Sequence, residues 1–430
     1  MRICFTGDAI MLTPPTDRYW RDNRLLEIIR GCDVRGGNLE MVLSGERAFA
    51  STFCGGQWLA TTPEKLDLLA RFGFDYFNTA NNHTMDYSYR GLEITGEELD
   101  KRGILHTGAG ASLSEASAPA WLSANGAKVA FVSCTASCDD AARAGDPSAN
   151  IPARPGVSML RHSQRLYVTA ENLAVIDAVA EATCVNARFL KAVRMGIHSL
   201  SPEIHRLGRL EFVLGEENKK VTACHRGDLQ RITDSVRVAR EGGADIVAVS
   251  VHSHDIKGES DDTADDYLEE FARACVDAGA SVVVGTGTHQ LKGIEIYRGC
   301  PIFYSLGNFM FRDEFMPYAP RDYYDRYHVP DTIDPEAFLA LRTKNGTVGL
   351  DRDPYNYRSV VPVLEYDGGT LTQATLHPIE LGFEGGDREK GFPYCAEAAV
   401  REEIAERLQR LSAPYGTRLA LDGAIIRLGL

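Results

Sequence analysis

Four short apolar runs along the chain are each followed by polar residues that could bind a ligand. The first run, Ile3 to Thr6, ends at Gly7-Asp8. The others cover residues 74–78, 245–251 and 281–284, and they precede Asn82 and His83, His252 and His254, and His289. A short continuous apolar run that breaks into polar residues is typical of a buried strand with a loop at its carboxyl end. The pattern predicts four buried strands with ligand-binding residues at the same end.

Amphipathic helices are predicted between these runs. One begins at Thr62-Pro63-Glu64, with proline in its first turn, and ends at Gly73. A second covers Asp228 to Glu241. A third has Thr263 as its N-terminal cap and carries an apolar stripe that includes Cys275. Strands that alternate with helices indicate an α/β core.

Two segments interrupt this alternation. Residues 139–227 contain several prolines among helix-like pieces, which favours an insertion. Residues 312–356 are irregular, and their many tyrosines and arginines are compatible with a mobile lid over a site or with an ordinary surface loop. Residues 357–430 predict an extension made of a hairpin around Asp367-Gly368 and a final helix. We expect one domain over residues 1–430 that carries these three additions.

Charge and hydropathy exclude several partners. The 46 basic and 60 acidic residues give a net charge of −14, which repels the phosphates of nucleic acid and the anionic face of a membrane. We therefore expect no nucleic-acid partner. No stretch approaches the ~18 consecutive apolar residues of a membrane helix, so we expect no membrane span. No signal sequence is visible before the first strand, which favours a cytoplasmic location.

Oxygen and imidazole donors gather at the predicted strand ends. In open α/β sheets ligands bind at the carboxyl ends of the strands, so donors that are scattered in sequence can converge there. Imidazoles combined with carboxylates and one amide suit zinc, manganese or iron better than calcium. Each residue alone also has an ordinary structural explanation, such as a turn or helix cap. The candidate donors are Asp8, Glu40, Asn82, His83, His252, His254 and His289.

Seven short motifs occur in a fixed order along the chain. They are Phe5-Thr6-Gly7-Asp8, Gly37-Asn38-Leu39-Glu40, Ala80-Asn81-Asn82-His83 followed by Asp86 and Gly91, Thr107-Gly108-Ala109-Gly110, Ser250-Val251-His252, Gly285-Thr286-Gly287-Thr288-His289 and Tyr304-Ser305-Leu306-Gly307-Asn308-Phe309. In this order they resemble the motifs of the CapA family of poly-γ-glutamate capsule biosynthesis proteins. The fold of that family is similar to that of calcineurin-like metallophosphoesterases. Each motif is weak alone, but seven in the same order make chance an inadequate explanation.

The resemblance implies a four-layer α/β/β/α sandwich with a metal centre at the strand ends. Asp8 would be the carboxylate of the first motif, and Glu40 would bridge two ions. Asn82, His252 and His289 would hold the second ion, with His254 as an extra donor. The phosphoesterase pattern has further histidines where this chain has Ile10 and Leu291. The first site would then keep only two ligands, and the centre could hold one ion instead of two.

The resemblance also implies an activity. The chain would be a metal-dependent hydrolase that uses one or two divalent ions, manganese, iron or zinc, on an anionic phosphoester or γ-glutamyl polymer. His83 or Asp86 would handle the proton, and basic residues between Arg321 and Arg326 would grip the substrate. The alternative is a non-catalytic binding or assembly component of polymer biosynthesis with a degraded metal site. The absence of a histidine at Ile10 favours that alternative.

Overall fold

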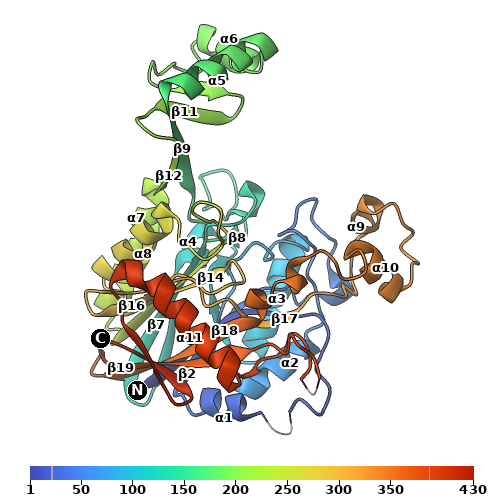
Figure 1. Cartoon of the computed structure of the whole chain (residues 1–430), viewed down its shortest axis with the longest axis vertical. Helices are drawn as coiled ribbons and strands as arrows, with labels where there is room; N and C mark the ends of the chain where they lie inside the picture. Colours follow the sequence, from blue (N-terminus) through green and yellow to red (C-terminus); the bar gives the residue numbers. More distant parts are fainter. Residues whose placement is uncertain (21–22, 387) are drawn as a thin grey trace.

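The computed structural model describes residues 1–20, 23–386 and 388–430. Its body is the predicted α/β sandwich, built on two sheets (Figure 1). Within the described residues, the larger sheet has ten strands. In spatial order these are β21 (Leu419–Asp422), β22 (Ile425–Leu428), β19 (Thr370–Glu380), β18 (Arg358–Asp367), β1 (Arg2–Met11), β2 (Val34–Leu39), β3 (Tyr76–Asn78) and β4 (Leu105–Thr107), with β17 (Asn308–Arg312) beside β1 and β20 (Tyr394–Cys395) beside β19.

The smaller sheet has six strands among the residues described. Their order is β15 (Ile294–Tyr297), β16 (Cys300–Phe303), β14 (Val282–Gly287), β13 (Ile246–Ser253), β7 (Ala127–Thr135) and β6 (Ala120–Ala124). A short pair, β5 (Ala109–Gly110) and β8 (Gly156–Val157), lies apart from both sheets.

The two sheets pack face to face because alternate residues of each strand point to opposite sides. On β1, Ile3 and Phe5 belong to the apolar cluster that also contains Phe131 of β7 and Val284 of β14. Cys4, between them, belongs to the cluster on the outer face of the large sheet. Burial of these side chains removes apolar surface from water and holds the sheets together.

Helices cover the outer face of each sheet. The large sheet is covered by α1 (Arg24–Arg30) and α2 (Glu64–Leu69), whose leucines lie in its outer cluster. The small sheet is covered by α7 (Arg226–Glu241) and α8 (Asp266–Asp277). The cap of α8 is Asp265 and not the predicted Thr263, because the Asp265 carboxylate accepts the first free N–H. The remaining helices of the body are α3 (Ser88–Lys101), α4 (Leu113–Ser117) and α11 (Ala398–Ser412).

Strand β1 extends beyond its predicted end. The sequence indicated a break at Gly7-Asp8, but the strand continues to Met11. Residues 9–11 are apolar and buried, and they pair in parallel with β17 on one side. The register shifts between Asp8 and Ala9 at this pairing, so the ladder is irregular where Asp8 lies.

Two segments extend from the body (Figure 1). Residues 162–224, called the arm below, form a separate sheet in the order β10 (His205–Leu207), β11 (Leu210–Leu214), β9 (His162–Val168), β12 (Lys219–Cys224), with α5 (Ala170–Thr183) and α6 (Ala187–Arg194) at its far end. The other segment carries α9 (Arg321–Arg326) and α10 (Pro335–Arg342). Among the described residues, no helix is both long enough and apolar enough to cross a membrane.

Candidate metal centre

The candidate donors lie at one edge of the sandwich because the central strands are parallel. β1 runs parallel to β2 and β17, and β13 runs parallel to β14 and β7. Their carboxyl ends therefore meet at the same edge. Gly7 permits this arrangement, because a side chain there would collide with the backbone carbonyl of Gly307.

Five of the predicted donors converge at this edge. Glu40, His252 and His254 form one group whose ligand atoms all lie within 4.8 Å of one another. Asp8, Glu40 and His289 form a second group that meets the same limit. Glu40 belongs to both groups, so the two could hold neighbouring cations through one shared carboxylate.

Glu40 is fully buried, and its environment is unusual for a carboxylate. Neither Oε1 nor Oε2 has a hydrogen-bond partner in the part of the chain described. Imidazole nitrogen atoms of His252, His83 and His254 lie 3.6, 3.9 and 4.0 Å from Oε1. Burial and the negative charge of Asp8 raise the pKa of Glu40 well above its ordinary value. A buried carboxylate without a partner is costly, and a bound cation would remove that cost.

His252 faces the cluster with Nε2. This atom lies 2.8 Å from Asn82 Oδ1 and 3.1 Å from Nε2 of His254. Burial lowers the pKa of His252, and desolvation together with the charge of His252 lowers the pKa of His254 well below its ordinary value. Both imidazoles are therefore kept neutral, which is the form that binds metal ions.

Asp8 is held by donors on two strands, β2 and β14. Asn38 Nδ2 donates to Oδ1 at 2.7 Å, and the Gly287 N–H donates to Oδ2 at 3.0 Å. Burial alone raises the pKa of Asp8, but His252, His289 and Asn38 outweigh that effect and hold the pKa well below its ordinary range. Asp8 is therefore ionised, as a metal ligand must be.

His289 has a strained backbone. Its φ is 60°, in the left-handed region that residues with a side chain seldom adopt. Its Nδ1 lies 2.8 Å from Asn308 Oδ1, which fixes the orientation of the ring. Strain of this kind persists where the surrounding structure enforces it, often at functional sites.

His83 and Asp86 form a pair beside Glu40. His83 Nδ1 lies 2.7 Å from Asp86 Oδ2. The Asp86 carboxylate also accepts hydrogen bonds from the N–H groups of Gly55 at 2.9 Å and Leu59 at 2.8 Å. With Nδ1 occupied, His83 turns Nε2 toward Glu40.

The two positions at which the phosphoesterase pattern has a histidine are apolar and buried here. Ile10 is part of the cluster on the outer face of the large sheet, and Leu291 is part of the cluster between the sheets. The structure compensates for neither with a new histidine at the same place. It places His289 with Asp8 and Glu40, and His254 with His252.

The two predicted substrate-binding arginines lie on α9, outside this cluster. Arg321 is exposed and forms ion pairs with Asp325 and Asp331. Arg326 lies over the Trp58 ring at 4.4 Å and donates to the Gly56 carbonyl at 3.4 Å.

Arg326 borders a cavity of about 280 Å³. Gly56, Gln57, Asp313 and Arg342 also line it. The loop that contains Gly56 and Gln57 also contacts the cluster, since Asn82 Nδ2 donates to the carbonyl of Gly55 at 2.8 Å. Arg326 thus lies beside the cluster, whereas Arg321 faces solvent.

Sequence reasoning did not assign roles to three supporting residues. Asn38 bonds Asp8, Asn308 orients His289, and Thr286 Oγ1 lies 3.0 Å from His252 Nδ1. All three are buried. All three occur in the quoted motifs, and Asn38 and Thr286 share a motif with a candidate donor, which was the available signal.

Comparisons with known proteins identify relatives over most of the chain. A family model described as "Bacterial capsule synthesis protein PGA_cap" matches residues 2–313. The uncharacterized protein y4sH of Sinorhizobium fredii is 33% identical over 413 residues, which cover 94% of this chain and 87% of that protein. The PGA biosynthesis protein CapA of Bacillus subtilis is 27% identical over 66% of this chain and 54% of its own length. The capsule biosynthesis protein CapA of Bacillus anthracis is 24% identical over 71% of this chain and 53% of its own length.

Proposed function

Because the chain belongs to the PGA_cap family of bacterial capsule synthesis proteins, we propose that it is a metal-dependent hydrolase. Its substrate is an anionic phosphoester or γ-glutamyl polymer, in poly-γ-glutamate synthesis or processing. The observation that carries the proposal is the buried Glu40 carboxylate, which has no hydrogen-bond partner among the described residues and faces three histidines. A divalent cation is the partner that suits this set of ligands.

Two neighbouring ions fit the donors. Asp8, Glu40 and His289 would hold one, and Glu40, His252 and His254 would hold the other. Asn82 Oδ1 lies close enough to His252 to join the second group. This arrangement would give the site of Asp8 a histidine ligand, His289, although Ile10 and Leu291 stand where the phosphoesterase pattern has histidines. When bound, manganese, iron or zinc supplies a Lewis acid that polarises the scissile group and acidifies water.

His83 is the residue that moves the proton. Its Nδ1 is bonded to Asp86, so Nε2 is the atom that faces the reaction space. Asp86 is a positioning residue, since backbone N–H groups and His83 occupy its oxygens. A fixed imidazole of this kind can give a proton to a leaving group or accept one from water.

Arg326 binds the anionic part of the substrate. Its guanidinium lies over an indole ring and donates to a backbone carbonyl, and Arg342 on the same cavity bonds Gln57 and the Glu314 carbonyl. No ion pair with a carboxylate involves either arginine within the described residues. Asp313, Glu314 and Asp351 also line this cavity, but the two guanidinium groups form no ion pair with them and so remain able to bind an anion.

The test is hydrolysis of bis(p-nitrophenyl) phosphate and of a synthetic γ-glutamyl peptide by manganese-loaded protein. We expect turnover of at least one substrate, and a loss of about a hundredfold or more in His252→Ala. His106→Ala is the control, because His106 pairs with Asp100 away from the cluster. Full turnover in His252→Ala would contradict the proposal.

A second candidate function is supported by Ile10 and Leu291. These apolar residues stand where the phosphoesterase pattern has histidines, so the chain could bind polymer or an assembly partner without hydrolysis. In that case neither substrate is turned over by metal-loaded protein, and the γ-glutamyl peptide still binds.

A further inference from the structure

The far end of the arm has an exposed surface that the proposed function does not use. About half of the exposed large apolar side chains among the described residues lie in the arm, although the arm is a small part of the chain. Isolated exposed apolar residues are ordinary, but a concentration of them marks an interaction surface. We call residues 184–202 the arm tip.

The apolar side chains of the tip are well exposed. Met195, Ile197 and Leu200, in the loop after α6, are 63%, 64% and 57% exposed. Val185 and Leu190 are exposed as well. Helix α6 itself has no buried residue. The arm has its own small core, in which Phe212 is buried, and so it does not need these side chains for folding.

The charges of the tip are all positive. Arg188, Lys191 and Arg194 are exposed, and residues 184–202 contain no aspartate or glutamate. No hydrogen bond or ion pair occupies these three side chains within the described chain. The whole chain carries −14, so the tip differs sharply from the rest of the molecule.

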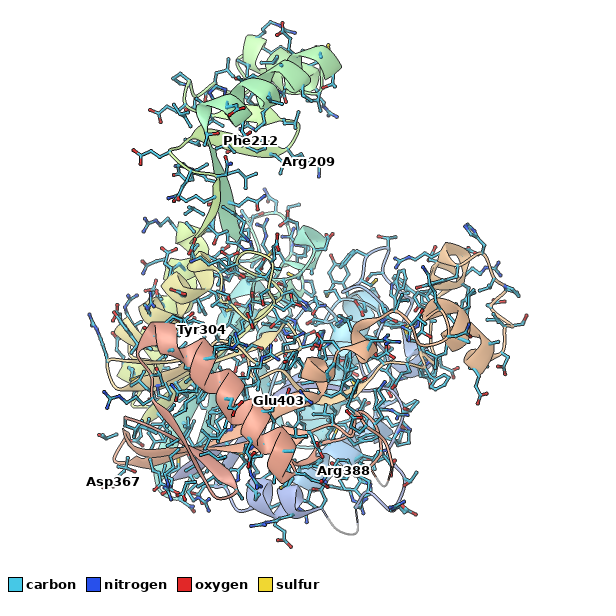
Figure 2. All side chains as sticks on the ribbon, in the orientation of Figure 1. Arg209, Phe212, Tyr304, Asp367, Arg388 and Glu403 are labelled. Carbon is cyan, nitrogen blue, oxygen red and sulfur yellow. The ribbon has the colours of Figure 1, made fainter. Side chains whose placement is uncertain are left out.

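The shape of the molecule separates the tip from the acidic body. Figure 1 shows α6 at the far end of the arm, and Figure 2 shows Phe212 and Arg209 on the arm, apart from the side chains of the body. Charges in salt solution are screened over a Debye length of about 8 Å. The tip can therefore meet an anionic surface while repulsion from the body is screened.

We propose that the arm tip binds the surface of an anionic lipid bilayer. Lys191 and its neighbouring arginines attract the anionic headgroups, and Met195, Ile197 and Leu200 enter the interface between headgroups and acyl chains. Exposed basic residues beside exposed apolar residues are the combination that interfacial binding requires. Binding of this kind needs no membrane-spanning helix.

The test is co-sedimentation with vesicles of phosphatidylcholine alone and of phosphatidylcholine with an equal part of phosphatidylglycerol. We expect binding to the anionic vesicles only, and weaker binding at high salt. Ile197→Glu and Lys191→Glu should each weaken binding by about tenfold or more. The matched control is Val238→Glu, because Val238 is 53% exposed on α7 of the body, and it should leave binding unchanged.

Three outcomes would overturn the proposal. The first is wild-type protein that does not sediment with anionic vesicles at low salt. The second is vesicle binding that Ile197→Glu and Lys191→Glu leave intact. The third is self-association, seen by light scattering, that Ile197→Glu abolishes in protein that does not bind vesicles, which would assign the tip to a second copy of the chain. Thermal melting of each variant checks that the fold is retained.

Discussion

At the scale of single residues, Glu40 differs from the other buried glutamates in having no partner. Glu98 is also buried, but Lys101 donates to its Oε1 at 2.8 Å and Arg102 to its Oε2 at 2.9 Å. These partners lower the pKa of Glu98 to about 2, whereas burial raises that of Glu40. An ionised glutamate therefore stabilises the fold at position 98 and destabilises it at position 40.

Glu40→Gln should stabilise the metal-free protein. The substitution removes a buried carboxylate without a partner, so we expect the free energy of unfolding at neutral pH to rise by about 1–3 kcal/mol. Because the pKa of Glu40 is raised, ionisation of Glu40 destabilises the fold as pH rises above about 4.5. The increase in the free energy of unfolding that Glu40→Gln causes should therefore grow as pH rises above this value. Urea unfolding of chelator-treated protein measures it.

Glu98→Gln is the matched control for that measurement. It weakens charge-assisted hydrogen bonds to Lys101 and Arg102, so it should lower stability. A metal-free Glu40→Gln variant that is no more stable than wild type would count against an unpaired carboxylate at this position.

The convergence of candidate donors at one edge was predictable, but their grouping into two sets was not. A polar residue after a buried strand is visible in sequence, and parallel strands bring such residues to one edge. The distribution of His254 and His289 over two ligand groups depends on loop geometry, including the left-handed backbone of His289. Asn38 was missed because a buried amide has no distinctive pattern until its partner Asp8 is placed.

At the scale of elements, the strands of the body were easier to predict than those of the arm. Buried strands such as β13 read as continuous apolar runs. β9 has exposed and half-buried residues without alternation, because the arm is thin and its sheet has little core to face. The end of β1 was misjudged for another reason: Gly7-Asp8 looks like a turn, but pairing with β17 continues the strand.

His377 tests how the C-terminal hairpin of β18 and β19 packs on the body. Burial and the charges of Arg2 and Arg24 lower its pKa from 6.5 to about 4. The unfolded chain therefore binds a proton that the folded chain does not, and stability falls as pH drops from about 6.5 to 4. In His377→Gln this loss should be smaller, by about 1.4 kcal/mol per pH unit. Urea unfolding across this range measures it, and an unchanged slope would show that His377 is not desolvated.

At the scale of the whole molecule, an acidic body carries a metal-ligand cluster and an arm with a basic tip. The net charge of −14 suggested repulsion from anionic surfaces. The net charge is a property of the whole chain and does not report local differences. The arm tip has no acidic residue, and the fold places it away from the body. The four-layer body followed from alternating strands and helices together with the motif order, whereas the position of the arm depends on long-range strand pairing.

Metal content tests the central claim most directly. Elemental analysis of protein purified without chelator, then loaded with manganese, iron or zinc, should find about two ions per chain. Glu40→Ala should lose both because Glu40 belongs to both ligand groups, and His252→Ala should lose at least one, whereas His106→Ala should retain both. Wild-type protein that retains no ion after loading with any of the three metals would contradict the account.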